Sequence, residues 1–140
     1  MDALLTQYRR IIEEGGPPRE VLSRLVGCVF ASFAGHRGAI TLWQDERPNL
    51  EKLPGFEYLT QAEADAERLW TEVIRQGIEG GGFRQDLDPR LAYRVIRDAI
   101  WMAARWYRPD GPLTTRQLAA QYVAIMLDGI DSQDCYSGAR

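Results

Sequence analysis

Three arginines and one tryptophan follow one another along a single predicted helix, and together they could bind a phosphate-bearing ligand. Arg94, Arg97, Trp101 and Arg105 are separated by three, four and four residues, a spacing that places them on one helix face. The planar guanidinium group can donate two hydrogen bonds to a phosphate, and an indole ring offers a flat surface for a purine. The row therefore indicates a site for a nucleotide-like head group such as that of CoA, with the acyl part of the ligand in the apolar interior. A solvated arginine row whose stems cover Trp101 through cation–π contact is the alternative.

Other residues that carry chemistry are sparse. His36 is the only histidine and follows a glycine at a helix junction, which favours a capping or surface imidazole over a general base. Cys28 lies in an apolar segment, where a buried, inert thiol is expected. The glycines at 80–82 lack the lysine and hydroxyl residue that complete a phosphate-binding P-loop. We therefore expect no catalytic residue, no metal site, no cofactor and no enzymatic activity.

The helix that carries the arginine row is predicted from Asp88 to Tyr107. Asp88 can cap its first turn with a side-chain oxygen, and Pro89 stands where a first-turn proline is tolerated. Apolar residues fill more than half of its circumference, an arc too wide for a helix that covers only one core. We therefore expect this helix to be packed on two sides, against its own domain and against something else.

Five further helices are predicted around it, which makes the fold class all-α with six helices. Glycine and proline runs separate the elements, and capping-box patterns mark helix starts at Thr60 and Thr114. The predicted helices cover residues 2–14, 17–35, 36–46, 60–79, 88–107 and 114–130. Residues 1–130 would form one helical domain, and residues 131–140 a polar tail. Within the domain, Phe30 and Trp70 are the apolar candidates for the ligand site.

The last two helices carry more apolar surface than a chain of 140 residues could cover by itself. This surplus predicts that two copies of the chain share the surface in a homodimer. The candidate interface residues are Ile96, Ile100, Tyr107, Leu118, Tyr122, Ile125 and Met126.

Composition sets limits on the class of protein. The formal net charge of −3 argues against nucleic-acid binding by a basic face of this chain alone. Two cysteines without paired spacing fit a reducing cytoplasm. The sequence has no apolar run of about 18 residues, so no membrane span is predicted. No secretory signal is predicted at the N-terminus, which carries charges within its first ten residues.

Two motifs carry a family resemblance. The runs GGGFRQDLDP (residues 80–89) and RWYRPDGPLTTRQLA (residues 105–119) resemble the C-terminal domain of TetR/AcrR-type transcriptional regulators, and the second is similar to the branch that senses CoA thioesters. The resemblance implies a four-helix dimer bundle made by the last two helices, and a pocket for a small hydrophobic ligand or CoA thioester lined by the preceding ones. An arginine and a tryptophan one turn apart contact the ligand in that branch, a spacing that Arg97 and Trp101 match. DNA would be bound only through an N-terminal helix-turn-helix that is absent from this chain.

The resemblance also implies a mechanism in which ligand shifts the relative tilt of the first and fourth helices, with residues 15–18 as the pivot. Two other readings belong to different classes of protein. One is a stand-alone helical interaction or scaffold module that uses the wide apolar arcs for another partner. The other is a small enzyme, which would need a pocket with a strongly perturbed acid or base.

Overall fold

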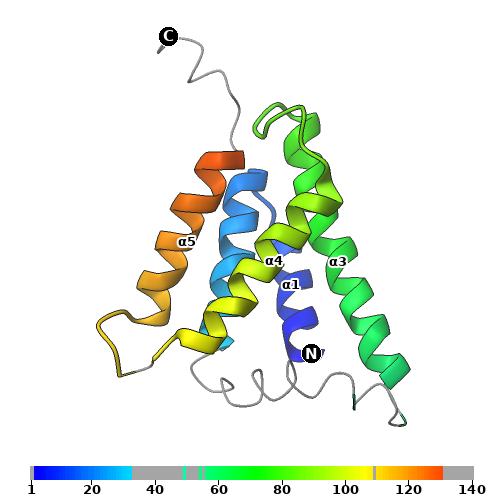
Figure 1. The fold of residues 1–140 in the computed structure, drawn as a ribbon. Coiled ribbons are helices and arrows are strands. Elements are labelled where there is room, and N and C mark those ends of the chain that lie inside the picture. Colours follow the sequence, from blue (N-terminus) through cyan, green and yellow to red (C-terminus); the bar gives the residue numbers. More distant parts are fainter. Residues whose placement is uncertain (1, 33–48, 50–53, 55, 109, 131–140) are drawn as a thin grey trace.

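The computed structural model describes residues 2–32, 49, 54, 56–108 and 110–130 (Figure 1). Over these residues the regular structure is helical, apart from one bridging residue at Phe83. The helices are α1 (Asp2–Glu14), a helix over residues 18–32, α3 (Phe56–Glu79), α4 (Pro89–Trp106) and α5 (Thr115–Ile130). The all-α prediction is therefore confirmed. The predicted helix at 36–46 and the polar tail lie outside the described residues.

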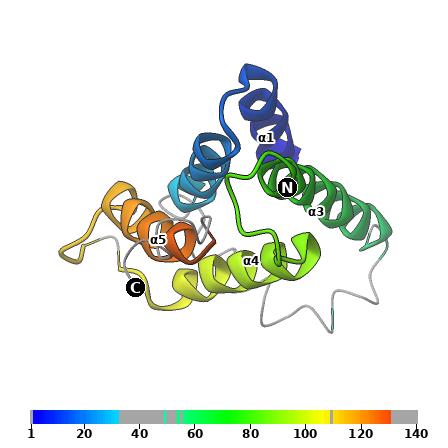
Figure 2. The ribbon, with the colours of Figure 1, turned by 90° about the horizontal axis from the view of Figure 1, so that it is seen from above.

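The helix over residues 18–32 supplies the centre of the core. Its side chains Leu22, Leu25, Val26 and Phe30 are fully buried, and it lies between α1 and α5 in both ribbon views (Figures 1 and 2). On the other side, α3 packs against both α1 and α4. None of the described helices is long and apolar enough to cross a membrane.

Helix α4 begins and ends as the sequence predicts. The carboxylate of Asp88 accepts hydrogen bonds from the backbone N–H groups of Arg90 (3.0 Å) and Leu91 (3.4 Å), which have no partner inside the helix. At the other end, the backbone N–H of Tyr107 donates to the carbonyl of Ala103 at 2.9 Å. The cap and both bounds agree with the prediction to within one residue.

The two predicted capping boxes have different outcomes. At the start of α5, the Thr114 N–H donates to Gln117 Oε1 (2.9 Å) and the Gln117 N–H donates to Thr114 Oγ1 (3.1 Å), so this box is confirmed. The box at Thr60 is wrong, because α3 begins at Phe56 and Thr60 lies one turn inside the helix. Pro54 and Gly55 directly precede Phe56, and no helix breaker separates them from Thr60.

The connection between α3 and α4 makes contacts with three helix ends. Gly81, with φ of 81°, turns the chain after α3, and the buried ring of Phe83 packs directly against Gly77. The backbone N–H of Arg84 then donates to the carbonyl of Ile130, the last residue of α5, at 2.8 Å. With Asp88 as the cap of α4, this short segment fixes the end of α3, the end of α5 and the start of α4.

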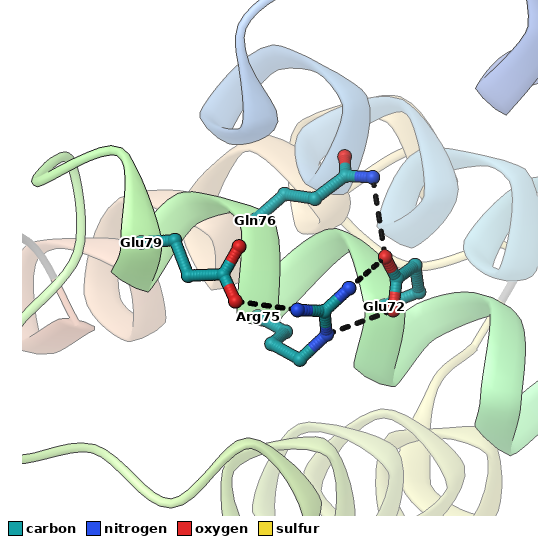
Figure 3. A network of polar contacts seen from close by, with 4 residues as sticks. All are labelled: Glu72, Arg75, Gln76 and Glu79. Carbon is teal, nitrogen blue, oxygen red and sulfur yellow. Dashed lines mark hydrogen bonds and ion pairs between the residues drawn. The ribbon is translucent and has the colours of Figure 1, made fainter.

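The solvent face of α3 carries a network of polar side chains (Figure 3). Arg75 Nε donates to Glu72 Oε2 at 2.9 Å, and the same guanidinium group pairs with Glu79. Gln76 adds a hydrogen bond to Glu72 at 3.4 Å. The hydrogen bond from Arg75 lowers the pKa of Glu72. These side chains are exposed, so the network supports the helix locally and takes no part in the core.

Candidate functional site

A small cavity lies where four helices meet, and two residues of the predicted arginine row line it. Its volume is about 20 Å³, which is enough for one water molecule and far too small for an organic ligand. The lining residues come from α1, the 18–32 helix, α3 and α4. They are Tyr8, Val29, Trp70, Tyr93, Arg97, Ile100 and Trp101.

A chain of aromatic contacts runs through the wall of this cavity. The ring of Tyr8 meets that of Trp70 edge-on, with 5.5 Å between centroids and an angle of 84°. Trp70 in turn meets Tyr93 at 5.9 Å and 63°. The guanidinium carbon of Arg97 lies 5.7 Å from the centroid of the Tyr93 ring, within the range of a cation–π contact. The chain therefore links α1, through α3, to the arginine row of α4.

Two tyrosine hydroxyl groups at the cavity remain protonated at neutral pH. Burial raises the pKa of Tyr93 to about 12, against a smaller opposing effect of the Arg97 charge. Burial also raises the pKa of Tyr8, and a hydrogen bond from Trp70 opposes it. Each neutral hydroxyl can therefore donate a hydrogen bond as well as accept one.

Arg97 stands at the border between cavity and solvent. Its Nε and Nη2 atoms donate to Asp98 Oδ1 at 3.0 and 2.9 Å, and its side chain is 38% exposed. Because this pairing is open to solvent, it binds the guanidinium group only weakly. Arg97 can therefore turn towards a phosphate or carboxylate that approaches the cavity, at little cost.

The structure brings together three of the six predicted ligand-binding residues and separates the others. Arg97 and Trp101 line the cavity beside Trp70, which reaches it from α3. Arg94 and Arg105 lie on the exposed surface of α4 and do not line this cavity. Phe30 is fully buried elsewhere in the core, with its ring 5.0 Å from that of Tyr122 on α5.

Four cavity residues were not among the predicted ligand-binding residues: Tyr8, Val29, Tyr93 and Ile100. Each lies on the apolar face of its own helix, where the sequence pattern predicts core packing and gives no sign of a cavity. The one available signal was the presence of two tyrosines on buried faces, since a buried hydroxyl usually needs a polar neighbour.

The predicted interface residues divide into two groups. Ile96, Ile100, Tyr107 and Leu118 are buried within one chain and belong to its core. The Tyr107 hydroxyl also donates to the carbonyl of Leu113 at 3.1 Å, so this side chain holds the turn after α4. Ile125 is 71% exposed, and Tyr122 and Met126 are partly buried. The large exposed apolar residues of α4 are others: Leu91, Val95, Met102 and Trp106.

These four residues form one stripe along α4, away from the cavity. Their helical positions place them on the side opposite Arg97. The ring of Trp106 lies 6.4 Å from that of Tyr122, so the stripe continues towards α5. Helix α4 thus presents a buried face, a cavity face and an exposed apolar face. Within the described segments, no three His, Cys, Asp or Glu side chains are grouped so as to hold a metal ion.

Comparisons with known proteins agree with this architecture. The family described as "Tetracyclin repressor-like, C-terminal domain" matches residues 15–130. The HTH-type transcriptional repressor KstR2 of Mycobacterium tuberculosis is 41% identical over 133 residues, which are 95% of this chain and 66% of that protein. The chain therefore spans slightly less than two thirds of the length of this relative.

Solved structures are similar over the same region. The structure of the ketosteroid transcriptional regulator KstR2 of Mycobacterium tuberculosis superposes with a TM-score of 0.87 and 42% identity, covering 93% of this chain and 66% of that one. The probable transcriptional regulatory protein RHA5900 gives a TM-score of 0.85 and 38% identity, covering 91% and 68%. The family match extends over most of the helical domain, and the fold agrees with it. The chain belongs to the tetracyclin repressor-like C-terminal domain family.

Proposed function

We propose that this chain is the ligand-sensing and dimerisation domain of a TetR-type transcriptional repressor, and that its inducer is a CoA thioester. The observation that carries the proposal is the position of Arg97 and Trp101, one turn apart on α4, at a cavity reached from three other helices. An arginine suits the phosphates of CoA, and an indole ring suits its adenine. DNA recognition belongs, in this proposal, to a helix-turn-helix outside residues 1–140, and the regulator acts in the cytoplasm.

The acyl part of the inducer would enter the cavity between Trp70 and Ile100. A similar protein is described as a ketosteroid transcriptional regulator, so we propose an acyl group derived from a ketosteroid. Pockets for ligands of drug size have volumes of about 300–1,000 Å³, and the cavity measures about 20 Å³. Binding of such a ligand therefore requires the walls of the cavity to separate.

In this proposal, the response to the ligand begins when the walls of the cavity separate. A ligand that binds an open state more tightly than the closed one shifts the population towards the open state. The relative tilt of α1 and α3 would change with it. In a homodimer, that change would alter the spacing of the two DNA-binding regions and release the operator.

Thermal unfolding tests whether the inducer is a CoA thioester. We expect a ketosteroid-derived acyl-CoA, and more weakly octanoyl-CoA, to raise the melting temperature, whereas free octanoic acid does not. A ligand present at 100 times its Kd stabilises the fold by about 2.7 kcal/mol, which a thermal shift assay readily detects. Replacement of Arg97 or Trp101 by alanine should remove the shift. Arg116→Ala, which changes an exposed arginine on α5 that does not line the cavity, serves as the matched control.

Two results would count against the inducer. Equal shifts with the acyl-CoA and the free acid would remove the role of the head group. An undiminished shift in Arg97→Ala and in Trp101→Ala would place the ligand elsewhere, even if CoA thioesters bind.

A further inference from the structure

One buried hydroxyl group at the cavity has no partner within the described chain. Tyr93 is 7% exposed, yet its hydroxyl forms no hydrogen bond with the residues that the structure describes. By contrast, the hydroxyl of Tyr107, which is 5% exposed, donates to the carbonyl of Leu113 at 3.1 Å. A buried hydroxyl without a partner is unfavourable, and native structures contain few of them. The partner of the Tyr93 hydroxyl therefore has to come from outside these residues.

The charged side chains near this hydroxyl have partners of their own. Burial raises the pKa of Tyr93, and the charges of Arg97, which lowers it, and Glu67, which raises it, have smaller effects. Both charges therefore lie near the phenol, where α3 packs against α4. Arg97 pairs with Asp98 at 2.9 Å, and Glu67 pairs with Arg90 at 3.8 Å. The Tyr93 hydroxyl thus stays available to a ligand beside the Arg97 cation.

Tyr93 lies between the two parts of the proposed ligand site. On one side its ring contacts Arg97, whose guanidinium carbon is 5.7 Å from the ring centroid, and Arg97 and Trp101 would bind the head group. On the other side the ring meets Trp70 at 5.9 Å, and Trp70 and Ile100 would enclose the acyl part. A CoA thioester that occupies both parts passes Tyr93 where its head group joins its acyl chain. That junction is the thioester group, whose carbonyl oxygen can accept a hydrogen bond.

We propose that the Tyr93 hydroxyl donates a hydrogen bond to the thioester carbonyl oxygen, and that Tyr93 thereby selects CoA thioesters over CoA derivatives without this carbonyl. The inference rests on the proposed function, which supplies the ligand and its placement. Free CoA and CoA thioethers carry the same head group as a thioester, so Arg97 and Trp101 alone do not distinguish them. A donor aimed at the carbonyl oxygen does, because a ligand that lacks this oxygen leaves the donor unpaired.

The test compares two ligands that differ at this one group. Octanoyl-CoA is a thioester, and S-octyl-CoA is the thioether of the same chain length, in which a methylene group replaces the carbonyl. Isothermal titration calorimetry with the full chain gives the Kd of each ligand. We expect the wild-type chain to bind octanoyl-CoA about fivefold more tightly than S-octyl-CoA. In Tyr93→Phe the ratio of the two Kd values should fall to about one, because no donor remains.

Tyr107→Phe is the matched control for this ratio. It removes the hydroxyl of a second buried tyrosine, which does not line the cavity. A general weakening of the fold would affect the two ligands alike and would leave the ratio of their Kd values unchanged. The ratio in Tyr107→Phe should therefore equal that of the wild-type chain.

A second measurement needs no ligand. Because the Tyr93 hydroxyl has no partner among the described residues, Tyr93→Phe should leave the urea midpoint of unfolding at neutral pH unchanged or raise it. Tyr107→Phe removes the hydrogen bond to Leu113 and should lower the midpoint. An equal decrease in both variants would show that the Tyr93 hydroxyl is already bonded within the chain, which overturns the proposal.

The two CoA derivatives also separate this proposal from the one on which it rests. If both bind and the ratio of their Kd values is the same in Tyr93→Phe and in the wild type, the role of Tyr93 is wrong and the CoA site stands. If neither binds the wild-type chain, the CoA inducer is refuted and the role of Tyr93 with it.

Discussion

The cavity has room for about one water molecule. Its lining includes one guanidinium group, two phenol rings and two indole rings. Arg97 stands at its edge with its charge shared with Asp98, whereas the Tyr8 and Tyr93 rings are buried. A charged group at the border can meet a polar head group without being taken out of water, and neutral hydroxyl groups can be buried at lower cost. This arrangement, with the charged group at the border and the neutral rings buried, suits a ligand that has one charged end and one apolar end.

The pKa of Tyr93 gives a test of this burial. Its value is raised from 10.0 to about 12 in the folded chain, mainly by burial. The stabilising effect of the protonated phenol is complete below pH 10 and is lost as the pH rises from 10 towards 12. We expect Tyr93 to contribute a loss of unfolding free energy on the order of 2 kcal/mol over this range. Urea unfolding at a series of pH values measures it.

Tyr93→Phe should reduce that dependence, because phenylalanine keeps the ring and has no proton to lose. The slope that remains includes Tyr8, whose pKa is also raised by burial. Tyr58→Phe, which alters a tyrosine that is 59% exposed, provides the comparison and should leave the slope as in the wild type. An equal slope in Tyr93→Phe and in the wild type would show that the phenol is hydrated in the folded state.

At the scale of elements, the connection after α3 is where close packing allows no extra atom. A Cβ added to Gly77 would lie 2.2 Å from the Phe83 ring, whereas a Cβ added to Gly27 would meet nothing within 4 Å. Gly77→Ala should therefore force Phe83 out of its place and destabilise the chain by about 1–3 kcal/mol. Gly27→Ala, also inside a helix, should stabilise it by about 0.4–1 kcal/mol because it restricts the unfolded chain. Chemical denaturation of the two variants measures the difference, and the prediction fails if both substitutions have the same sign.

Sequence patterns that act over a few residues predicted most of the helix ends, and the capping-box pattern at Thr60 was the exception. Asp88, Thr114 and the glycines after Glu79 mark helix ends because each acts on backbone groups within five residues of itself. Thr60 carries the same pattern inside α3, where a favourable helix sequence continues through it. A capping pattern thus predicts a helix start only when a breaker stands directly before it.

The site was predictable in part for a similar reason. The spacing of Arg97 and Trp101 is a property of one helix, so the sequence alone placed both on one face. The cavity also needs Tyr8 and Val29, from two helices far away in the sequence, and no periodicity reports that contact. Likewise, the wide apolar arc of α4 predicted two packed sides but not which half faces the core. Ile96 and Ile100 turned out to be the buried half.

For the whole molecule, α4 carries both the cavity residues and the exposed apolar stripe. The exposed stripe of Leu91, Val95, Met102 and Trp106 reaches α5 where Trp106 meets Tyr122, and Ile125 of α5 is also exposed. An apolar surface of this kind is typical of an interaction site. Because the stripe and the cavity lie on different sides of the same helix, we expect a change of tilt at the cavity to displace the stripe as well. A second copy of the chain is the partner that the family membership favours.

We therefore expect a twofold dimer at micromolar concentration, and we expect Val95→Glu to separate it. Val95 is 58% exposed, so a glutamate is tolerated in the single chain, but a carboxylate buried against the partner's apolar stripe lacks any compensating charge. Light scattering coupled to size exclusion should report half the wild-type mass. Ala64→Glu, at an exposed position of α3 away from the stripe, should leave the mass unchanged. A wild-type chain that is already monomeric would instead favour a stand-alone interaction module whose stripe binds another protein, because apolar side chains so exposed on one helix face would still require a partner.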